Sequence, residues 1–275
     1  MTTAMDAFHC FCGETKFNPG PTYISKWGPV PLVRCAACRT YRTSAVPSAS
    51  DLVWLYESDD IYHPCSEEVF RARARDFEAV LADLRGLGLE RRDLLEVGCN
   101  AGYALSAFLE SGWSVTGIET NESTADYARK RLGVRIVSRI DSLPQTETFD
   151  VALLSHVLEH IPDPSSFLRA LASRLRRGGL VCVLVPNYGS LLVRHVLKGA
   201  WCGFIPLQHV WYFDSLSLAG LMRKCGFFPV MVKSRHYLDW RSRTLWRTAI
   251  KIPLAGVHRL FPKDGTELLG IFRVE

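Results

Sequence analysis

A single segment, LLEVGCNAGYALSAFL at residues 94–109, restricts the fold of this chain more than any other part of the sequence. It starts as an apolar strand with Glu96 near its end, turns through Gly98 and Gly102, and continues as a helix. Gly98 permits a positive φ and the close approach of a ligand, and Gly102 lets the first helical turn come near that ligand. A strand that feeds a helix N-terminus through such a turn is typical of nucleotide-binding sites.

A second acidic residue extends this pattern. The strand SVTGIE, residues 114–119, ends in Glu119, which suits a pair of ribose hydroxyls. A dinucleotide-binding fingerprint requires G-x-G-x-x-G or G-x-G-x-x-A. Counting from Gly98, the second glycine position holds Asn100 and the third holds Tyr103, so that fingerprint is absent.

The pattern E-x-G-x-x-x-G followed by a strand-end glutamate resembles the class I S-adenosylmethionine (SAM) methyltransferases. The resemblance implies that Glu119 holds the ribose of SAM. It also implies that four residues line the methionine part: Glu96, Gly98, Asn100 and Gly102. Asn100 stands where the usual family signature has its middle glycine. Asparagine tolerates the left-handed backbone region better than most residues, so the departure is mild.

A second motif, FDVALLSHVLEHIPDP at residues 149–164, delivers polar side chains to the carboxyl edge of the expected sheet, where ligands bind. It resembles the fourth-strand motif of the small-molecule branch of the same superfamily. The resemblance implies that Ser155 and His156 lie near the SAM methionine and the transferred methyl group, and that His160 packs or caps. Ser155 is therefore expected to bind the cofactor, and His156 is a catalytic candidate.

The turn RIDSLP, residues 139–144, carries the expected contacts to the adenine. Asp141 resembles the acidic residue of the family that accepts a hydrogen bond from the adenine amino group, and Ser142 stands beside it. The alternative for Asp141, taken alone, is an ordinary surface turn residue.

The loop PLQHVWYFDSLSL, residues 206–218, holds His209, the first candidate for a general base. A neutral imidazole near pH 7 can accept a hydroxyl or C–H proton as the methyl group arrives. The loop resembles the E-H-x-x-Y-F run of deoxysugar C-methyltransferases, with Gln208 in place of the glutamate and with His209 and Tyr212 matching. Tyr212 is accordingly a further catalytic candidate. The alternative is that His209 only orients the loop.

Two close pairs of soft ligands near the N-terminus predict a structural zinc site. HCFCG at residues 9–13 and CAAC at residues 35–38 flank a stretch rich in glycine, proline and aromatic residues. This arrangement fits a tetrahedral zinc ribbon, and four protein ligands would make the metal structural. The expected ligands are Cys12, Cys35 and Cys38, with either Cys10 or His9 as the fourth. The alternative is a set of reduced cysteines in a small hydrophobic ribbon.

This module resembles the zinc-binding segment that precedes the catalytic domain in deoxysugar C-methyltransferases. Those enzymes carry an additional large C-terminal domain, for which this chain of 275 residues is too short, so their chemistry is not carried over. We expect three parts: a zinc-binding ribbon at residues 1–50, a helical cover segment at residues 51–90 and a SAM-binding methyltransferase domain at residues 91–275.

Strand and helix patterns alternate along the rest of the chain. They predict an α/β fold, a doubly wound Rossmann-like sheet of seven strands beside the small N-terminal zinc ribbon. Strands are expected at residues 93–98, 114–119, 134–138, 149–155, 180–185, 228–234 and 266–275. Helices are expected at residues 102–111, 123–132, 165–176 and 215–225. An amphipathic helix at residues 66–85 is expected to cover the SAM pocket, which Tyr62 and His63 could also reach.

The charge and the distribution of apolar residues limit which partners and which cellular compartment we expect for this chain. The net charge is +5, and the basic residues are scattered, which argues against a nucleic-acid partner. No apolar run is long enough to span a bilayer, and the N-terminus lacks the regions of a signal peptide, so we expect a cytoplasmic protein. Residues 240–260 are basic and aromatic. They are expected to form a lid or a dimer contact, with a membrane patch as the weaker alternative.

We therefore expect a SAM-dependent methyltransferase that acts on a small polar acceptor, such as a sugar, a glycan or a specialised metabolite, and we favour O-methylation. Three alternatives stay open: a C-methyltransferase on a nucleotide sugar, an RNA methyltransferase, and a non-catalytic binding protein on a methyltransferase fold. The presence of Glu119 and of the glycine turn argues against the last of these.

Overall fold

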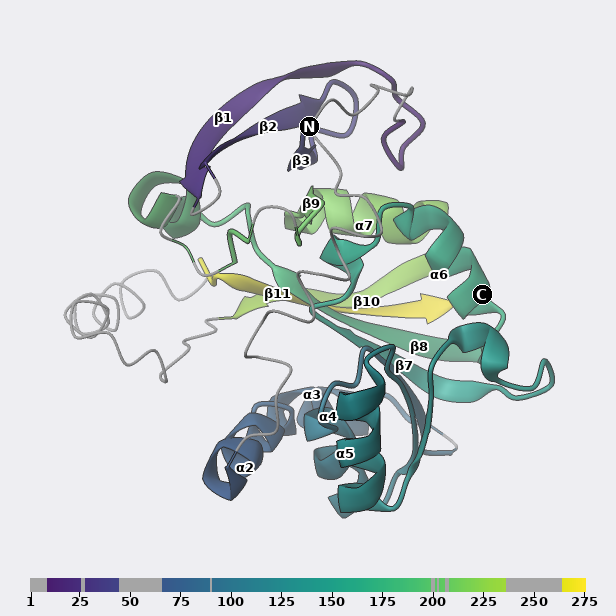
Figure 1. Cartoon of the computed structure of the whole chain (residues 1–275). Coiled ribbons are helices and arrows are strands. Elements are labelled where there is room, and N and C mark those ends of the chain that lie inside the picture. Colours follow the sequence, from purple (N-terminus) through teal and green to yellow (C-terminus); the bar gives the residue numbers. More distant parts are fainter. Residues whose placement is uncertain are drawn as a thin grey trace.

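The structure is a computed structural model that describes residues 9–25, 28–44, 66–89, 91–198, 201, 203–205, 208–235 and 264–275. At its centre lies a sheet of seven strands in the order β10-β11-β8-β7-β4-β5-β6 (Figure 1). These strands are β4 (Asp93–Val97), β5 (Ser114–Ile118), β6 (Arg135–Val137), β7 (Phe149–Ser155), β8 (Leu175–Pro186), β10 (Phe227–Arg235) and β11 (Glu267–Val274). The pairs among β4 to β8 are parallel, whereas β11 pairs antiparallel with both β8 and β10. The predicted doubly wound sheet is confirmed.

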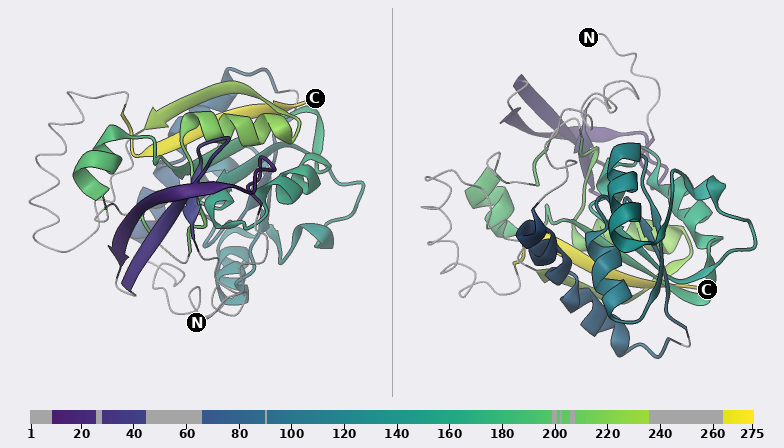
Figure 2. Two further views of the ribbon diagram at one scale, coloured as in Figure 1. Left: turned by 90° about the horizontal axis from the view of Figure 1, so that it is seen from above. Right: turned by 60° about the horizontal axis from the view of Figure 1, so that its bottom comes forward.

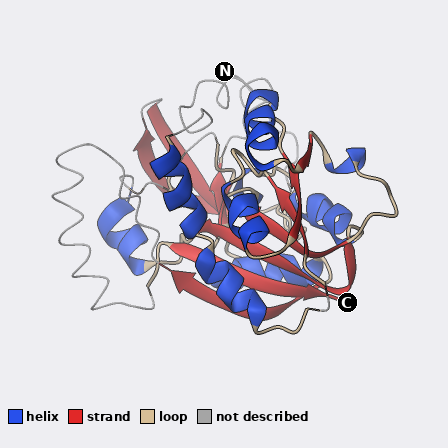
Figure 3. Cartoon of the chain, turned by 90° about the horizontal axis from the view of Figure 1, so that it is seen from below, coloured by secondary structure: helices blue, strands red, loops and turns tan. Residues whose placement is uncertain are grey.

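The inner strands are apolar along most of their length because helices cover both faces of the sheet. One face is covered by α3 (Glu78–Arg85), α4 (Tyr103–Glu110) and α5 (Glu122–Leu132). The other face is covered by α6 (Pro164–Ala172) and α7 (Ser215–Lys224). Figure 1 shows the two layers on opposite sides of the sheet, and Figure 3 shows helices lying in front of the strands. Successive residues of β7 alternate between the layers, with Leu153 in one core and Leu154 in the other.

The single helix predicted at residues 66–85 is wrong in one respect, because two helices share the segment: α2 (Glu67–Arg75) and α3. Between them the backbone N–H groups of Asp76 and Phe77 bond to carbonyls three residues back instead of four. Such a turn is tighter than an α-helix and redirects the chain. As a result, α2 packs on α4 while α3 reaches the face of the sheet.

The predicted helix at residues 165–176 also ends early, and the strand after it begins before residue 180. The helix α6 ends at Ala172, and β8 begins at Leu175. Leu175 pairs with Phe149 at the start of β7, and the N–H of Phe149 donates to the carbonyl of Arg174 at 2.9 Å. Sheet pairing therefore overrides the helical periodicity of the local sequence.

A second sheet, of four strands in the order β1-β2-β3-β9, lies above the large sheet in Figure 1. Three of its strands come from the N-terminal module: β1 (Phe17–Ser25), β2 (Gly28–Cys35) and β3 (Tyr41–Thr43). The fourth, β9 (Trp211–Tyr212), comes from the loop that holds His209, and Tyr41 pairs with Tyr212. Both views of Figure 2 show the tip of the β1–β2 hairpin projecting away from the large sheet. No pattern in the sequence predicted β9.

Some predictions fall outside the described residues, namely those for Tyr62, His63 and residues 240–260. Within the described ranges, no helix combines the length and the apolar character needed to cross a bilayer.

The variant Phe108→Ala should lower the free energy of unfolding by about 3–5 kcal/mol, because it leaves a cavity in the core. Phe108 is fully buried in α4, and its ring lies 5.1 Å from that of Trp113, centroid to centroid. Leu109→Ala is the matched control, since Leu109 is 39% exposed, and it should cost less than about 0.5 kcal/mol. Urea unfolding followed by circular dichroism measures both variants. Equal losses would contradict the described packing of α4.

Candidate functional site

The turn after β4 contains three residues with positive φ: Gly98 at 69°, Asn100 at 48° and Gly102 at 84°. The N–H groups of Gly98 and Cys99 both donate to the carbonyl of Ile118 at the end of β5, at 2.8 and 3.0 Å. Gly102 is the N-cap of α4. The strand, the turn and the helix therefore form as predicted, and Asn100 adopts the left-handed conformation that an asparagine tolerates.

Gly98 and Gly102 leave no room for a side chain. A Cβ atom at Gly98 would lie 2.7 Å from Cγ2 of Val157, and one at Gly102 would lie 2.6 Å from Cδ1 of Leu132. Val157 belongs to the SHVLEH segment after β7. The contact therefore brings the turn predicted to bind the methionine part against the segment predicted to lie near the transferred methyl group.

The carboxylate of Glu119 joins two strand-end turns. Its Oε2 accepts the N–H of Asn100 and its Oε1 accepts the N–H of Asn121, both at 2.9 Å. Asn121 is the N-cap of α5. Glu119 is only 6% exposed, yet a carboxylate has about four acceptor positions, so it can take further donors. An acidic group with spare acceptor capacity thus lies between the glycine turn and α5, where the ribose is expected.

Glu96 lies in β4, directly before the glycine turn, and is 2% exposed. Within the described part of the chain its Oε2 has no hydrogen-bond partner. Burial, together with the nearby charge of Glu119, raises the pKa of Glu96 well above its usual range. A buried polar atom without a partner is costly. The unpaired Oε2 of Glu96 fits a site in which a ligand, such as the amino group of a methionine moiety, provides the missing partner.

The segment after β7 holds a network of ionised groups. His156 has a φ of 54°, and its Nε2 lies 2.7 Å from Oε1 of Glu267 while its Nδ1 lies 3.3 Å from Oε1 of Glu159. Glu267 also binds Nε of Arg235. Burial would lower the pKa of His156, but the carboxylates of Glu159 and Glu267 outweigh it and raise the pKa to about 10. His156 is therefore an imidazolium at neutral pH. Ser155, half-buried, lies beside it at the end of β7.

Next to His156 lies a cluster of three residues: Glu159 and His209, which are buried, and His160, which is half-buried. Burial would raise the pKa of Glu159, but the surrounding histidines, with His156 foremost, lower it to about 2. Nε2 of His209 lies 4.0 Å from Oε1 of Glu159, and the rings of His160 and His209 meet edge-on with centroids 4.6 Å apart. Burial, reinforced by His160, lowers the pKa of His209 to about 3, so its imidazole is neutral at pH 7.

Tyr212 completes the set of predicted catalytic residues. Its ring centroid lies 6.4 Å from that of His209, and the side chain is 2% exposed. Burial raises the pKa of Tyr212, and its hydroxyl has no hydrogen-bond partner among the described residues. The structure thus brings Tyr212 beside His209 and connects His156 to His209 through Glu159. The sequence placed Glu159 only at the start of the turn after β7. Glu267 was not predicted, because nothing in the last strand indicates a partner more than a hundred residues upstream.

The predicted adenine contacts lie at the surface. Asp141 and Ser142 belong to a short 3-10 turn and are both exposed. Arg139 donates to Asp141 from Nε at 3.1 Å and from Nη2 at 3.0 Å, and these bonds lower the pKa of Asp141. The structure does not bring Asp141 into the buried network around Glu119, and its contact with adenine stays a prediction.

Four cysteine sulfur atoms gather beside the N-terminal sheet, all within 4.8 Å of one another: Cys10, Cys12, Cys35 and Cys38. The Sγ atoms of Cys10 and Cys38 lie 3.5 Å apart, as do those of Cys12 and Cys35. Thiolates placed tetrahedrally around zinc at about 2.3 Å would be separated by about 3.8 Å, so this cluster could hold such an ion. The structure brings Cys10 into the cluster, whereas His9 is exposed and lies outside it.

The cysteine cluster packs against the loop that carries His209 and Tyr212. The ring of Phe11, which lies inside the first cysteine pair, is 5.0 Å from that of Trp211, centroid to centroid. The carbonyl of Phe11 accepts a hydrogen bond from Nζ of Lys224 in α7 at 2.7 Å. Together with the β3–β9 pair, these contacts join the N-terminal module and the loop in one hydrophobic core.

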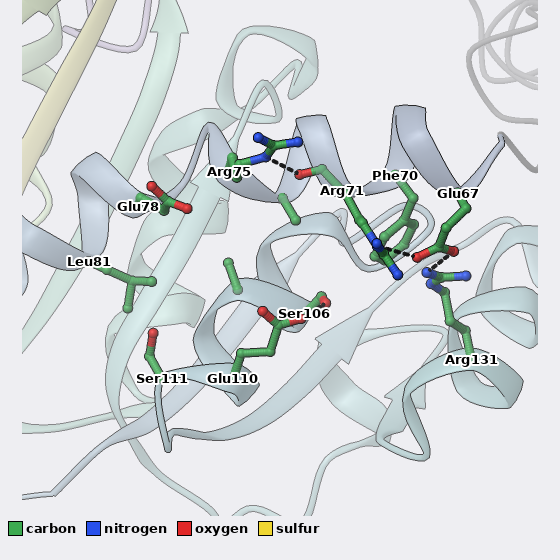
Figure 4. A pocket seen from close by; sticks show the side chains of 12 residues that line it. Glu67, Phe70, Arg71, Arg75, Glu78, Leu81, Ser106, Glu110, Ser111 and Arg131 are labelled. Carbon is green, nitrogen blue, oxygen red and sulfur yellow. Dashed lines mark hydrogen bonds and ion pairs between the residues drawn. The ribbon is translucent and has the colours of Figure 1, made fainter.

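A cavity of about 690 Å³ lies between α2, α3 and α4 (Figure 4). Charged side chains, among them Arg71, Glu110 and Arg131, line it together with Phe70 and Leu81. None of the predicted site residues is part of its lining. The cavity is therefore separate from the candidate site.

This fold and this site together define a class I SAM-dependent methyltransferase. Residues 69–231, more than half of the chain, match the family described as a methyltransferase domain, and the chain belongs to that family.

Two similar proteins carry the name ubiquinone biosynthesis O-methyltransferase. The ubiquinone biosynthesis O-methyltransferase of Bordetella avium is 34% identical over 164 residues, which cover 54% of this chain and 67% of the relative. That of Hydrogenovibrio crunogenus is 27% identical over 153 residues, covering 51% and 64% respectively. The chain thus spans about two thirds of the length of these two relatives.

A solved structure shows the same fold. It is the 1,6-didemethyltoxoflavin-N1-methyltransferase of Burkholderia thailandensis, with bound 1,6-didemethyltoxoflavin and S-adenosylhomocysteine. The similarity has a TM-score of 0.56 at 21% identity and covers 94% of this chain and 99% of that chain.

The variant Glu119→Gln should weaken the binding of S-adenosylhomocysteine by about 10- to 100-fold, since a hydrogen bond to an ionised group contributes about 1.5–3 kcal/mol. Glu122→Gln is the matched control, because Glu122 lies three residues further on and its side chain is 71% exposed. Isothermal titration calorimetry measures both affinities. Unchanged affinity in folded Glu119→Gln protein would show that the ribose is held elsewhere.

Proposed function

We propose that this chain transfers a methyl group from SAM to an oxygen atom of a small polar molecule. The observation that carries the proposal is the buried carboxylate of Glu119, which is held at the glycine turn and retains acceptor capacity for a ribose. Membership in the methyltransferase-domain family supports it. The names of the two O-methyltransferase relatives favour oxygen as the accepting atom.

The proposed contacts with SAM form three groups, one each for its ribose, its adenine and its methionine part. Glu119 binds the ribose, and Asp141 and Ser142 lie on the adenine side. The methionine part is lined by Glu96, Gly98, Asn100, Gly102 and Ser155. SAM supplies a methyl group on a sulfonium, which is transferred by in-line displacement. The protein contributes mainly proximity and orientation of the two reactants.

The proposed acceptor side is formed by His209, Tyr212 and His156. The imidazole of His209 is neutral at pH 7. Its lowered pKa makes it a weak base, so it would take the proton of the hydroxyl group only as the oxygen bonds to the methyl group and that proton becomes strongly acidic. His156 is held as a cation between Glu159 and Glu267, so it is unsuited to act as a base. Its proposed part is to position Glu159 beside His209. The Tyr212 hydroxyl, which lacks a partner among the described residues, can donate a hydrogen bond to the acceptor.

We propose a small molecule rather than a nucleic acid as the acceptor. The relatives described above carry the names of enzymes of ubiquinone biosynthesis and of toxoflavin-type compounds, and this favours a biosynthetic intermediate. Within this proposal the acceptor is a sugar, a glycan or a specialised metabolite that bears a hydroxyl group.

We also propose that the four-cysteine cluster binds a structural zinc ion, supported by the separation of its sulfur atoms. In this view the chain has a zinc-binding ribbon at residues 1–50, a cover segment at residues 51–90 and a SAM-binding domain at residues 91–275. Because β3 of the ribbon pairs with β9, zinc would also fix the loop that carries His209.

Incubation of the purified protein with methyl-labelled SAM and a panel of hydroxyl-bearing small molecules tests the proposed reaction. We expect label on an oxygen atom of at least one compound, and slower transfer by Glu119→Gln protein when the SAM concentration is well below saturation. Transfer only to carbon or nitrogen would contradict O-methylation. A folded protein that does not bind S-adenosylhomocysteine would contradict methyl transfer altogether.

The variant His209→Gln should lower kcat by about 10²- to 10⁴-fold, the range typical of a lost general base, with unchanged affinity for S-adenosylhomocysteine. His195→Gln is the matched control, since His195 is an exposed residue of η4 (Leu192–Leu197) outside the cluster, and its kcat should not change. Steady-state kinetics and calorimetry provide the two readouts. Full activity of His209→Gln protein would remove His209 from the reaction.

The wild-type protein should contain about one zinc ion per chain, and Cys12→Ser should lose it and unfold at a lower temperature. Zinc in small four-ligand modules contributes about 10–16 kcal/mol of apparent folding free energy. Cys225→Ser, which changes a buried cysteine outside the cluster, should keep the metal. Elemental analysis and thermal unfolding measure both effects. A well-folded wild-type protein without zinc would refute the proposed site.

A further inference from the structure

A second group of side chains of the types that bind metals lies away from the cysteines, in the cluster of Glu159, His160 and His209. Two of these residues belong to the short helix η3 (Leu158–His160), and the third comes from the loop before β9. One carboxylate oxygen of Glu159 and one nitrogen of each imidazole all lie within 4.8 Å of one another. Separate parts of the chain thus bring three ligand atoms close enough together to contact one ion.

Backbone carbonyls fix the orientation of both imidazoles. Nδ1 of His209 lies 2.8 Å from the carbonyl oxygen of Gly203, and Nδ1 of His160 lies 2.9 Å from that of Gln208. A carbonyl oxygen can only accept, so each Nδ1 must carry the proton, which in a neutral ring leaves the lone pair on Nε2. Nε2 of His209 lies 4.0 Å from Oε1 of Glu159. Metal-binding histidines are typically held in this way, with the other ring nitrogen donating to a carbonyl.

The carboxylate of Glu159 forms an ion pair with His156 but keeps acceptor positions for a further partner. The residue is 0% exposed, and neither carboxylate oxygen accepts a hydrogen bond from the described residues. Its closest ionic neighbour is Nδ1 of His156, at 3.3 Å, and Glu267 shares that imidazole from its other nitrogen at 2.7 Å. His156 and Arg235 balance the charges of Glu159 and Glu267, so what Glu159 lacks within the described part of the chain is hydrogen bonds to its two oxygens. Coordination of a cation is one way to offset the cost of burying such oxygens.

We propose that Glu159, His160 and His209 bind a divalent transition-metal ion, such as Zn²⁺ or Mn²⁺. Two imidazole nitrogens and one carboxylate oxygen are a donor set of intermediate softness that suits such ions, unlike the four thiolates of the N-terminal cluster. Three protein ligands leave coordination positions open, as in metal sites that take part in reactions.

The site lies beside the proposed acceptor side of the pocket. The ring of Tyr212 is 6.4 Å from that of His209, centroid to centroid. An open coordination position there suits a water molecule or a hydroxyl oxygen, whose pKa a divalent ion lowers. His209 would then serve as a ligand instead of a base. Metal binding itself does not depend on the proposed methyl transfer, because it is measured without cosubstrate or acceptor.

Titration of the zinc-loaded full chain with Mn²⁺, followed by electron paramagnetic resonance, tests the proposal. Mn²⁺ prefers oxygen and nitrogen donors, so it should leave the thiolate cluster alone. We expect about one bound Mn²⁺ per chain and a rise in the unfolding temperature on binding. Glu159→Gln and His209→Gln should each weaken the affinity by at least about tenfold, the minimum usually seen when a group supporting a metal site is lost. His195→Gln should bind Mn²⁺ as the wild type does.

Two outcomes would overturn the proposal. One is a wild-type protein that binds neither Mn²⁺ nor a second equivalent of Zn²⁺ and shows no shift in unfolding temperature. The other is binding that Glu159→Gln and His209→Gln leave unchanged, with circular dichroism showing both variants folded. If either variant fails to fold, His160→Gln and the wild-type shift in unfolding temperature still decide the question. A protein that binds no metal at this site would not contradict the proposed methyl transfer. A protein that transfers no methyl group would not contradict the proposed metal site.

Discussion

The hydrogen bonds from the backbone to the Glu119 carboxylate are the interaction on which the rest of the site depends. They hold the N–H groups of Asn100 and Asn121, and so fix the glycine turn after β4 relative to the start of α5. A buried carboxylate needs hydrogen-bond donors. The backbone of the turn and the hydroxyls of a bound ribose would both donate to the same carboxylate, that of Glu119. The contact of Gly98 with Val157 then sets the distance from this turn to the segment that carries His156.

The acceptor side is built by a different part of the chain. The N-terminal module reaches it through the pairing of β3 with β9 and through the packing of Phe11 on Trp211. The loop with His209 and Tyr212 is therefore held between the seven-stranded sheet and the cysteine cluster. Zinc bound there would act on the reaction indirectly, by keeping this loop in place.

The sequence predicted those features of the fold that depend on interactions between residues close together in the chain. The glycine turn, the carboxylate at the end of β5 and the order of strands and helices follow from residues close together in the chain. The cysteine spacing likewise predicted the cluster, although only the structure separated Cys10 from His9. What the sequence could not predict depends on distant partners. Leu175 joins β8 because Phe149 pairs with it, and Glu267 meets His156 across the sheet.

A crystal structure of the protein with S-adenosylhomocysteine tests the central role of Glu119 most directly. We expect both ribose hydroxyls to lie within hydrogen-bond distance of the Glu119 carboxylate, which keeps its hydrogen bond from the backbone N–H of Asn100. A ribose bound by other groups, or a nucleoside located away from the glycine turn, would contradict it.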